Sequence, residues 1–184
     1  SAVWGSGPTH AFAVGLPPVA LRWDGSSWAK TTAGLATPQR GVATLSDTDA
    51  LVVAFNGKAA RFNGSTWSPV ATNTSANFSG VWAGNGSYYI VGNTVGAGTV
   101  LLKLSGTTVQ DISNGFQPGA LTAIGGAGAI VFAVGKGTVI RYDGSFWSAV
   151  GPPGETELFT GVWAASAKEV FAVGANGTVW HGQL

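Results

Sequence analysis

The chain has 184 residues, of which 9% are charged, whereas about 25% are charged in an average soluble protein. Its formal net charge of +1 gives no electrostatic basis for binding nucleic acid or an anionic membrane surface. Cysteine is absent, which excludes disulfides and thiolate metal sites, and no apolar run approaches the roughly 18 residues of a membrane-spanning helix. We therefore expect neither a nucleic-acid partner nor membrane insertion.

Methionine is absent as well, so the chain has no initiator residue. We interpret the sequence as a mature or excised piece of a longer product. The low charge, together with Asn, Ser and Thr in the turns, favours a secreted or cell-surface protein.

Residues 1–41 contain a pattern that recurs along the chain. A Val-Trp pair at residues 3–4 opens this unit, and the apolar run Ala11–Gly15 follows. A third segment ends in Arg22-Trp-Asp-Gly-Ser-Ser-Trp28, whose last residue begins a fourth segment. Each segment is short, β-branched or aromatic, and bounded by Gly, Asn, Asp or Pro, which is typical of a β-strand.

The later units repeat this order. Residues 42–80 contain Arg61-Phe-Asn-Gly-Ser-Thr-Trp67, residues 81–120 the degenerate copy Lys103-Leu-Ser-Gly-Thr-Thr-Val109, and residues 121–161 contain Arg141-Tyr-Asp-Gly-Ser-Phe-Trp147. Residues 162–184 have the first three segments, with His181 at the basic position, but stop before a fourth. A fixed period near 40 residues indicates an array of similar small units.

The pattern predicts an all-β protein with essentially no helix. Asp-Gly and Asn-Gly pairs favour two-residue hairpins, because both central residues of such a turn need positive φ. The second segment of each unit is apolar on both faces, as expected when neighbouring sheets cover it from both sides. A β-helix has shorter coils without Asp-Gly hairpins, and a sandwich would not give so regular a period. The prediction is therefore a single domain, residues 1–184, forming a five-bladed β-propeller of four-stranded antiparallel blades. The predicted blades are 1–41, 42–80, 81–120, 121–161 and an incomplete 162–184.

The incomplete last blade leaves three alternatives open. The ring closes by side-chain packing alone, the open edge pairs with another copy, or the blades belong to a larger array. An uncovered strand edge favours association, so self-association through residues 177–184 is one expectation.

The repeat resembles the Trp- and Gly-rich propeller repeats of large bacterial secreted or surface proteins, in which a Val-Trp strand, an Ala-Val-Gly strand and an Arg-aromatic-Asp-Gly-Ser-x-Trp hairpin follow one another. The likeness covers the whole chain, although residues 81–120 depart from it at the hairpin. The chain is also loosely similar to the Asp-box (BNR) repeats of sialidase-type propellers and, in blade number, to tachylectin-type lectins. These resemblances imply the fold and leave the function open.

Residues that recur in every unit are interpreted as structural. The basic positions are expected to pack along aromatic rings or to pair with a nearby carboxylate or carbonyl, and the tryptophans to wedge between blades. These repeat positions are Arg22, Trp28, Arg61, Trp67, Lys103, Arg141, Trp147 and His181.

The sequence offers little for catalysis. Glycosidases need converging carboxylates, but none of the eight acidic residues falls on a predicted first strand. Glu155 and Glu157 share one loop and are interpreted as solvated loop charge rather than as a cation site. Asp47-Thr-Asp49 lacks the remaining ligands of a calcium loop. Two histidines do not form a zinc site of the usual kind by themselves. We predict a non-catalytic protein without a cofactor or metal.

Variable loops are the remaining candidates for a site. Residues 31–41, 71–80, 112–120 and 151–161 connect successive units and emerge on one rim, where a rigid ring would hold them together. Amides beside exposed aromatics suit sugars. The predicted ligand-binding residues are Gln39, Arg40, Asn77, Phe78, Gln117, Glu157 and Phe159.

Our first hypothesis from the sequence is a lectin-like module that recognises glycans through this rim. The alternative is a structural or protein-interaction repeat of a larger surface protein, with the open edge of the last blade making the contact. A glycosidase is the third and least favoured hypothesis.

Overall fold

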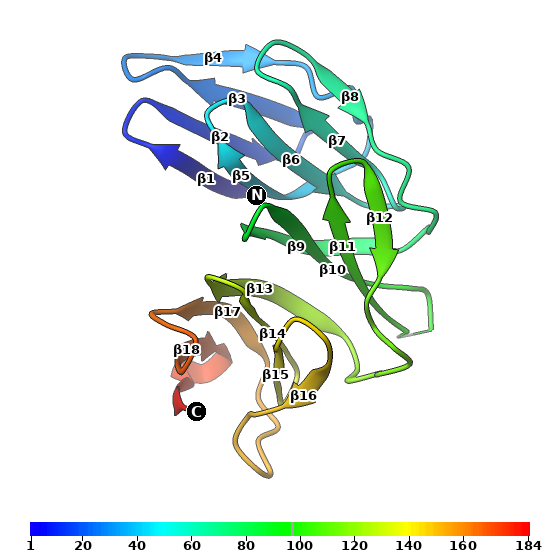
Figure 1. The fold of residues 1–184 in the computed structure, drawn as a ribbon, viewed down its shortest axis with the longest axis vertical. Helices are drawn as coiled ribbons and strands as arrows, with labels where there is room; N and C mark the ends of the chain where they lie inside the picture. The colour runs from blue at the N-terminus through cyan, green and yellow to red at the C-terminus, as the bar shows by residue number, and fades with distance from the viewer. Residues whose placement is uncertain (97) are drawn as a thin grey trace.

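A computed structural model describes residues 1–96 and 98–184 of the chain. These residues form five antiparallel sheets, each built from strands that are consecutive in the sequence (Figure 1). The first sheet contains β1 (Ala2–Gly7), β2 (His10–Gly15), β3 (Val19–Trp23) and β4 (Trp28–Thr31). The second contains β5 (Gln39–Ser46), β6 (Asp49–Ala54), β7 (Ala59–Phe62) and β8 (Trp67–Pro69).

The remaining three sheets follow the same order. The third sheet contains β9 (Asn77–Gly84), β10 (Ser87–Asn93), β11 (Thr99–Ser105) and β12 (Thr108–Asp111). The fourth contains β13 (Leu121–Ala127), β14 (Ile130–Gly135), β15 (Thr138–Tyr142) and β16 (Trp147–Ala149). The fifth contains β17 (Phe159–Ala164), β18 (Glu169–Gly174) and β19 (Val179–Gln183), with the short 3-10 turn η1 (Ala175–Gly177) before β19. The predicted all-β fold of four four-stranded blades and one three-stranded blade is therefore confirmed.

Hairpins between the third and fourth strands form at the predicted Asp-Gly and Asn-Gly pairs, but the predicted two-residue turn is wrong there, because four residues connect the paired strands and only the glycine of each pair has positive φ. Gly25, Gly64 and Gly144 have φ values of 99°, 96° and 105°, a region that disfavours a side chain. The residue before each glycine accepts hydrogen bonds from two backbone N–H groups further along the turn. In the first hairpin, Asp24 Oδ1 accepts from the N–H groups of Ser26 and Ser27, both at 2.8 Å.

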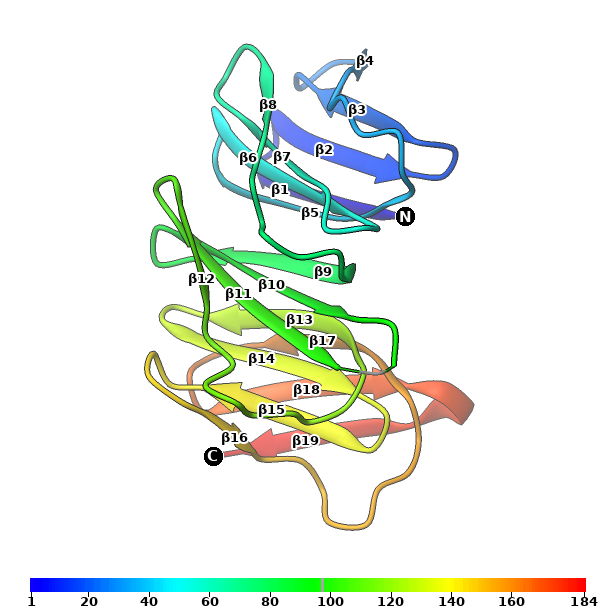
Figure 2. The ribbon, with the colours of Figure 1, turned by 90° about the vertical axis from the view of Figure 1, so that its right-hand side faces the viewer.

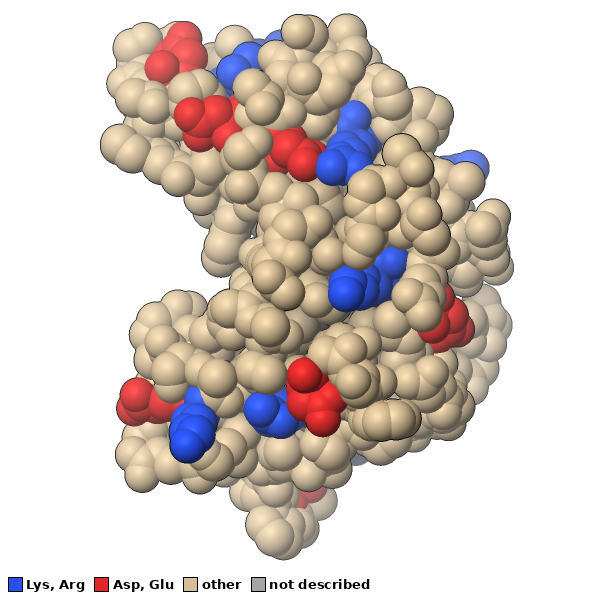
Figure 3. Space-filling model, in the orientation of Figure 1, with Lys and Arg blue, Asp and Glu red and all other residues tan. Residues whose placement is uncertain are grey.

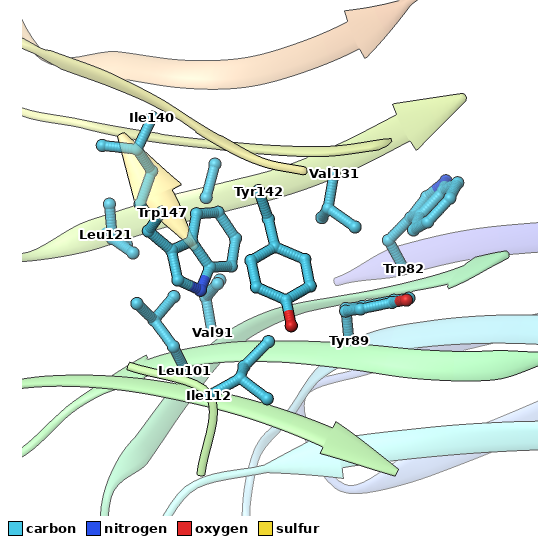
Figure 4. Close-up of a cluster of buried hydrophobic side chains, with 11 residues drawn as sticks. Trp82, Tyr89, Val91, Leu101, Ile112, Leu121, Val131, Ile140, Tyr142 and Trp147 are labelled. Carbon is cyan, nitrogen blue, oxygen red and sulfur yellow. The ribbon is translucent and has the colours of Figure 1, made fainter. Parts of the chain in front are cut away.

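The blades pack face to face through their apolar strands. We call the face that meets the following blade the trailing face, and the face that meets the preceding blade the leading face. Figure 4 shows one such interface, in which Tyr89 and Leu101 on the trailing face of the third blade meet Ile140, Tyr142 and Trp147 on the leading face of the fourth. Interdigitated aromatic and aliphatic side chains of this kind bury large apolar areas, which is the main stabilising contribution in such a fold.

The five blades form an arc. Strands β1, β5, β9, β13 and β17 lie innermost, and each contacts the next in that order, whereas β1 and β17 make no comparable contact among the described residues. Figure 1 shows this open arrangement, and Figure 2 shows the first three sheets following one another from the top, with the fourth and fifth overlapping below them. The first of the three alternatives, a ring closed by side-chain packing alone, is therefore wrong for this structure.

The first strands begin earlier than the sequence pattern suggested. Strand β5 begins at Gln39, β9 at Asn77 and β17 at Phe159, three or four residues before the Val that marks each segment. A β-bulge near the start of each of these strands breaks the alternation of apolar and polar residues. Residues assigned to loops from the sequence are consequently strand residues.

No helix in the described part of the chain is long and apolar enough to cross a membrane.

Candidate functional site

The first strands of the blades surround a groove along the axis of the arc, which we call the central groove. Its volume is about 460 Å³, and β1, β5, β9, β13 and β17 all contribute to its lining. Figure 3 shows the molecule as a crescent that is deeply hollowed between its two arms. Because the innermost strands come from all five blades, a ligand there would contact segments that are far apart in the sequence.

One end of the central groove carries a ring of polar side chains placed by β-bulges. Arg40, Ser79, Thr122 and Thr160 are each the extra residue of a bulge in the first strand of a blade. All four line the groove, together with Ser1 at the start of the first blade. A bulge redirects a side chain away from the regular alternation of a strand. Bulges thus place one polar residue at this end of the groove in each of the second to fifth blades.

Two of these four hydroxyls, those of Ser79 and Thr122, already have structural partners. The Thr122 hydroxyl donates to the Phe159 carbonyl at 2.5 Å, with the Val134 carbonyl 3.0 Å away as the alternative acceptor, and so joins the fourth and fifth blades. Ser79 Oγ accepts a hydrogen bond from Asn93 Nδ2 at 3.1 Å. These hydrogen bonds hold strands of the repeat together, within the third blade for Ser79 and between the fourth and fifth blades for Thr122, and give these two hydroxyls a structural role.

Arg40 departs from the repeat. Its guanidinium lies over the Phe55 ring, with Cζ 5.3 Å from the ring centroid, and the residue is exposed. Arg40 is the only charged side chain among the described residues that line the groove, and no described carboxylate lies within 4 Å of it. A guanidinium stacked in this way keeps its N–H fork available for a planar anion such as a carboxylate.

The opposite end of the groove is aromatic. Trp4 is 43% exposed and Trp163 is 61% exposed, and both line the groove. Trp82, the equivalent residue of the third blade, is only 7% exposed because its ring lies against Gly84 and Gly126. The central groove therefore runs from a polar end with one cation to an apolar end with exposed indole rings.

The residues predicted to bind a ligand on the loop rim do not form one site. Two of the polar ones connect loops: Asn77 Oδ1 accepts from the Asn56 N–H at 3.2 Å, and Gln117 Oε1 accepts from the Thr99 N–H at 2.9 Å. Glu157 Oε2 likewise accepts from Asn176 Nδ2 at 2.9 Å. Gln39 is 3% exposed, and its Oε1 has no hydrogen-bond partner among the described residues. Of the seven, only Arg40 lines the central groove.

The two aromatic residues of that prediction are wrong as exposed contacts. Phe78 and Phe159 are both 0% exposed. Each lies one residue before a bulge, at the position that Leu121 occupies in the fourth blade, and each packs between two blades. Their rings cannot stack on a sugar, because the adjacent blade already covers them.

A second groove lies on the loop rim, which we call the rim groove. It has a volume of about 470 Å³ and is lined by residues 34–37, 56–59 and 69–74, so two of the predicted variable loops do meet there. Thr37, Asn56, Thr72 and Thr74 supply hydroxyls and an amide, and no aromatic residue lines it.

Four of the five repeated basic residues lie on aromatic rings or against carboxylates, whereas the buried Nε of Arg141 has no hydrogen-bond partner among the described residues. Arg22 lies over the Phe62 ring at 5.2 Å and Lys103 over the Tyr89 ring at 5.6 Å. His181 stacks on Phe171 with ring centroids 4.3 Å apart and pairs with Glu169 at 3.1 Å. The repeated tryptophans pack against third-strand aromatics; the partner pairs are Trp23–Trp28, Phe62–Trp67 and Tyr142–Trp147. Trp67 and Trp147 also lie between blades as predicted, but the prediction is wrong for Trp28, which is 46% exposed because no described blade covers the leading face of the first.

Sequence reasoning missed one cluster of charges between the second and third blades. Arg61 donates to both carboxylate oxygens of Asp49, through Nε at 2.8 Å and Nη2 at 2.7 Å, and Nη1 donates to the Gly106 carbonyl. The Tyr88 hydroxyl of the third blade donates to Asp49 Oδ1 at 2.9 Å. Burial acts to raise the pKa of Asp49, but the hydrogen bonds from Arg61 and Tyr88 and the Arg61 charge outweigh it and lower that pKa. The sequence did contain a signal for this ion pair. Asp49 lies two residues before the apolar run that pairs with the strand of the repeated Arg61.

The carboxylates are dispersed. Asp24 and Asp143 lie in hairpins, where hydrogen bonds from backbone N–H groups lower the pKa of both. Asp47 pairs with His10 at 3.2 Å and accepts from the Ser6 hydroxyl at 2.5 Å. Within the described residues, no group of three or more His, Cys, Asp or Glu side chains could hold a metal ion.

Neither a protein-family model nor a curated protein sequence matches the chain. Solved propeller structures do match. YCF48 bound to a D1 peptide aligns with a TM-score of 0.73 at 14% identity, covering 97% of this chain and 63% of that one. Virginiamycin B lyase from Staphylococcus aureus aligns with a TM-score of 0.70 at 12% identity, covering 100% and 67%. A chain of the nidogen/laminin complex aligns with a TM-score of 0.72 at 8% identity, covering 96% and 72%.

These likenesses establish the fold, and the chain is a β-propeller repeat protein. It spans less than two thirds of the length of YCF48. The matched proteins include a peptide complex, a protein complex and a lyase by their names. Because propellers carry unrelated functions, these likenesses leave the function of the chain open, and the grooves of the chain bear on it.

Proposed function

We propose that this propeller is a non-catalytic binding module that takes a segment of a partner protein into its central groove. The observation that carries the proposal is the combination of an unpaired Arg40 at one end of the groove with the exposed Trp4 at the other. A protein-interaction role was the alternative hypothesis from the sequence, which placed the contact at the open edge of the last blade rather than in this groove. The peptide complex of YCF48 and the nidogen/laminin complex show that related folds bind peptide or protein partners.

The lining indicates the kind of segment. The walls between the two ends are aliphatic or glycine, and Val42, Val81, Ile124 and Val162 are among the lining residues. An extended peptide with an acidic group at one end and apolar or aromatic residues beyond it would match this order. The acidic group would accept two parallel hydrogen bonds from the Arg40 fork, and an apolar side chain would cover the Trp4 indole.

The same residues argue against catalysis. The groove lining contains no carboxylate, histidine or cysteine, so it offers no general base and no side chain poised as an activated nucleophile. We therefore propose binding without turnover.

Panning a phage-displayed peptide library against the protein tests this proposal. We expect selected peptides that share an acidic residue next to an apolar run. Arg40→Glu should weaken their binding by at least about tenfold, because a hydrogen bond to a charged group contributes roughly 1.5–3 kcal/mol. Lys30→Glu, which makes the same charge change on the exposed outer strand β4, should bind like the wild type. No enrichment, or equal binding by wild type and Arg40→Glu, would contradict the proposal.

Glycan binding is a second candidate, favoured by the hydroxyl and amide lining of the rim groove. The loss of Phe78 and Phe159 as contacts removes the aromatic stacking on which the lectin hypothesis depended. A glycan array would support this candidate if binding survived Arg40→Glu and was lost in Lys58→Glu, which changes an exposed residue of the rim groove. An array without positive sugars would reject it.

A further inference from the structure

The trailing face of the fifth blade exposes Val173 and Val179, whose equivalents the other four blades bury, and a tryptophan, Trp163, that is more exposed than its equivalents Trp4 and Trp82. Val179 is 69% exposed, Trp163 61% and Val173 48%. Trp163 stacks on Phe171, with ring centroids 5.9 Å apart, and Phe171 stacks on His181. The result is a row of three rings across the three strands, without a covering layer among the described residues.

The other four blades show what this face normally contacts. Strand pairing places Val179 at the position of Ala20, Ala59, Leu101 and Val139, which are each at most 2% exposed beneath the next blade. Phe171 corresponds to Phe12, Leu51, Tyr89 and Phe132, which are also at most 2% exposed. Four equivalent faces are thus each covered by the leading face of a following blade.

The Glu169–His181 pair shows which of the four covered faces is most similar to the trailing face of the fifth blade. Glu169 lies two residues before Phe171 and pairs with His181, just as Asp49 lies two residues before Leu51 and pairs with Arg61. Among the described interfaces, only that between the second and third blades has a carboxylate of the second strand paired with a basic residue of the third strand of the same blade, because the His10–Asp47 pair joins the first blade to the second. There, Tyr88 of the following blade donates its hydroxyl to the carboxylate. The fifth blade therefore has the trailing face that the second blade presents to the third.

We propose that the trailing face of the fifth blade is a docking surface for one further β-blade of this repeat, of the type of the third blade, with a tyrosine at the position of Tyr88. The occupant would bury Trp163 as the fourth blade buries Trp82. Its tyrosine would donate to Glu169, as Tyr88 donates to Asp49. This contact differs from strand addition at the edge of β19, because it uses the face of the sheet and leaves backbone edges out.

The chain contains no cysteine, so a single engineered thiol can report on the face. Val179→Cys should react rapidly with Ellman's reagent, at a rate close to that of Val95→Cys, whose position is 100% exposed. Val139→Cys, at the equivalent position of the fourth blade, should react at least about a hundredfold more slowly, because its reaction requires the interface to open.

Docking is then tested by appending a second copy of the third blade, residues 76–111, behind Leu184 through a flexible Gly/Ser linker of about 12 residues. We expect Val179→Cys to react at least about tenfold more slowly in this fusion than in the parent chain. Tyr88→Phe in the appended copy should restore part of the reactivity. Ile90→Asp in the appended copy, at a position that is 1% exposed between the second and third blades, should restore all of it.

Three results would overturn the proposal. The first is unchanged reactivity of Val179→Cys in the fusion. The second is an appended blade that a protease digests while the five native blades resist. The third is protection of Val179→Cys in the unfused chain that increases with protein concentration, which would make a second copy of the chain the occupant. If the fusion does not yield folded protein, a fusion that appends residues 76–158, two blades, provides the same comparison.

Discussion

Removing the Tyr88 hydroxyl should weaken the interface between the second and third blades in a measurable and specific way. The substitution Tyr88→Phe keeps the ring, which is fully buried, and deletes one hydrogen bond of 2.9 Å to the Asp49 carboxylate. No cavity larger than one oxygen atom results, so the loss of the bond to a charged acceptor dominates. We expect a cost of about 1.5–3 kcal/mol, equivalent to a fall in Tm of roughly 3–12 °C for a chain of this size.

Thermal and urea unfolding, followed by tryptophan fluorescence, would measure the effect. Tyr142→Phe is the matched control, because its hydroxyl donates at 2.9 Å to the uncharged carbonyl of Gly144 within its own blade. The control should cost about 0.5–1.5 kcal/mol. Combining Tyr88→Phe with Asp49→Ala should then remove most of the additional cost of Tyr88→Phe, since the charged acceptor is gone. A Tyr88→Phe variant as stable as the wild type, or no less stable than Tyr142→Phe, would refute this account of the interface.

Three further predictions concern pH, packing and backbone. Because the folded state lowers the pKa of Asp49, the ionised carboxylate stabilises the fold at pH values above its unfolded-state pKa of about 3.9. This contribution is lost as the pH falls through the lower folded-state pKa, so the acid unfolding curve of Asp49→Asn should lack it. Phe132→Ala, at a fully buried position, should cost about 3–5 kcal/mol in chemical unfolding, and Phe171→Ala on the uncovered face should cost less than half as much; equal costs would mean that the face is covered in solution. Gly57→Ala should destabilise the protein far more than Gly86→Ala in a thermal scan. Both glycines have φ near +67°, so the backbone strain is matched, but a Cβ at Gly57 would lie within 2 Å of a loop carbonyl while a Cβ at Gly86 would have open space. Similar Tm values would contradict this.

The fold could be predicted from the sequence because the same pattern of strand and turn residues occurs in several units of the repeat. Asp24-Gly25 and Asn63-Gly64 specify hairpins by the backbone conformation they favour, and the apolar second strands require cover on both faces. The number of strands in each blade followed from counting segments. Closure of the ring did not follow, because the relative tilt of successive blades is set by the side chains between them and leaves no periodic mark in the sequence.

The candidate site was harder to predict because it depends on bulges. Phe78 and Phe159 were assigned to loops, whereas a bulge one residue later conceals that each strand has already begun. Alignment with Leu121 could have indicated their burial. Arg40 was assigned to a loop of the rim, whereas it lies on β5 and lines the central groove, which depends on five strands from separate blades meeting at one axis. No pairwise spacing in the sequence reveals that convergence.

Hydrogen–deuterium exchange with a bound peptide tests the proposed function most directly. A peptide selected by panning should slow exchange in the first strands that line the central groove, at residues 40–42, 79–82 and 122–126, and should leave the hairpins of the outer strands unchanged. The same peptide should give no protection in Arg40→Glu. Protection confined to the rim groove or to the outer hairpins, or protection of the first strands that persists in Arg40→Glu, would contradict the proposal that the central groove binds through Arg40.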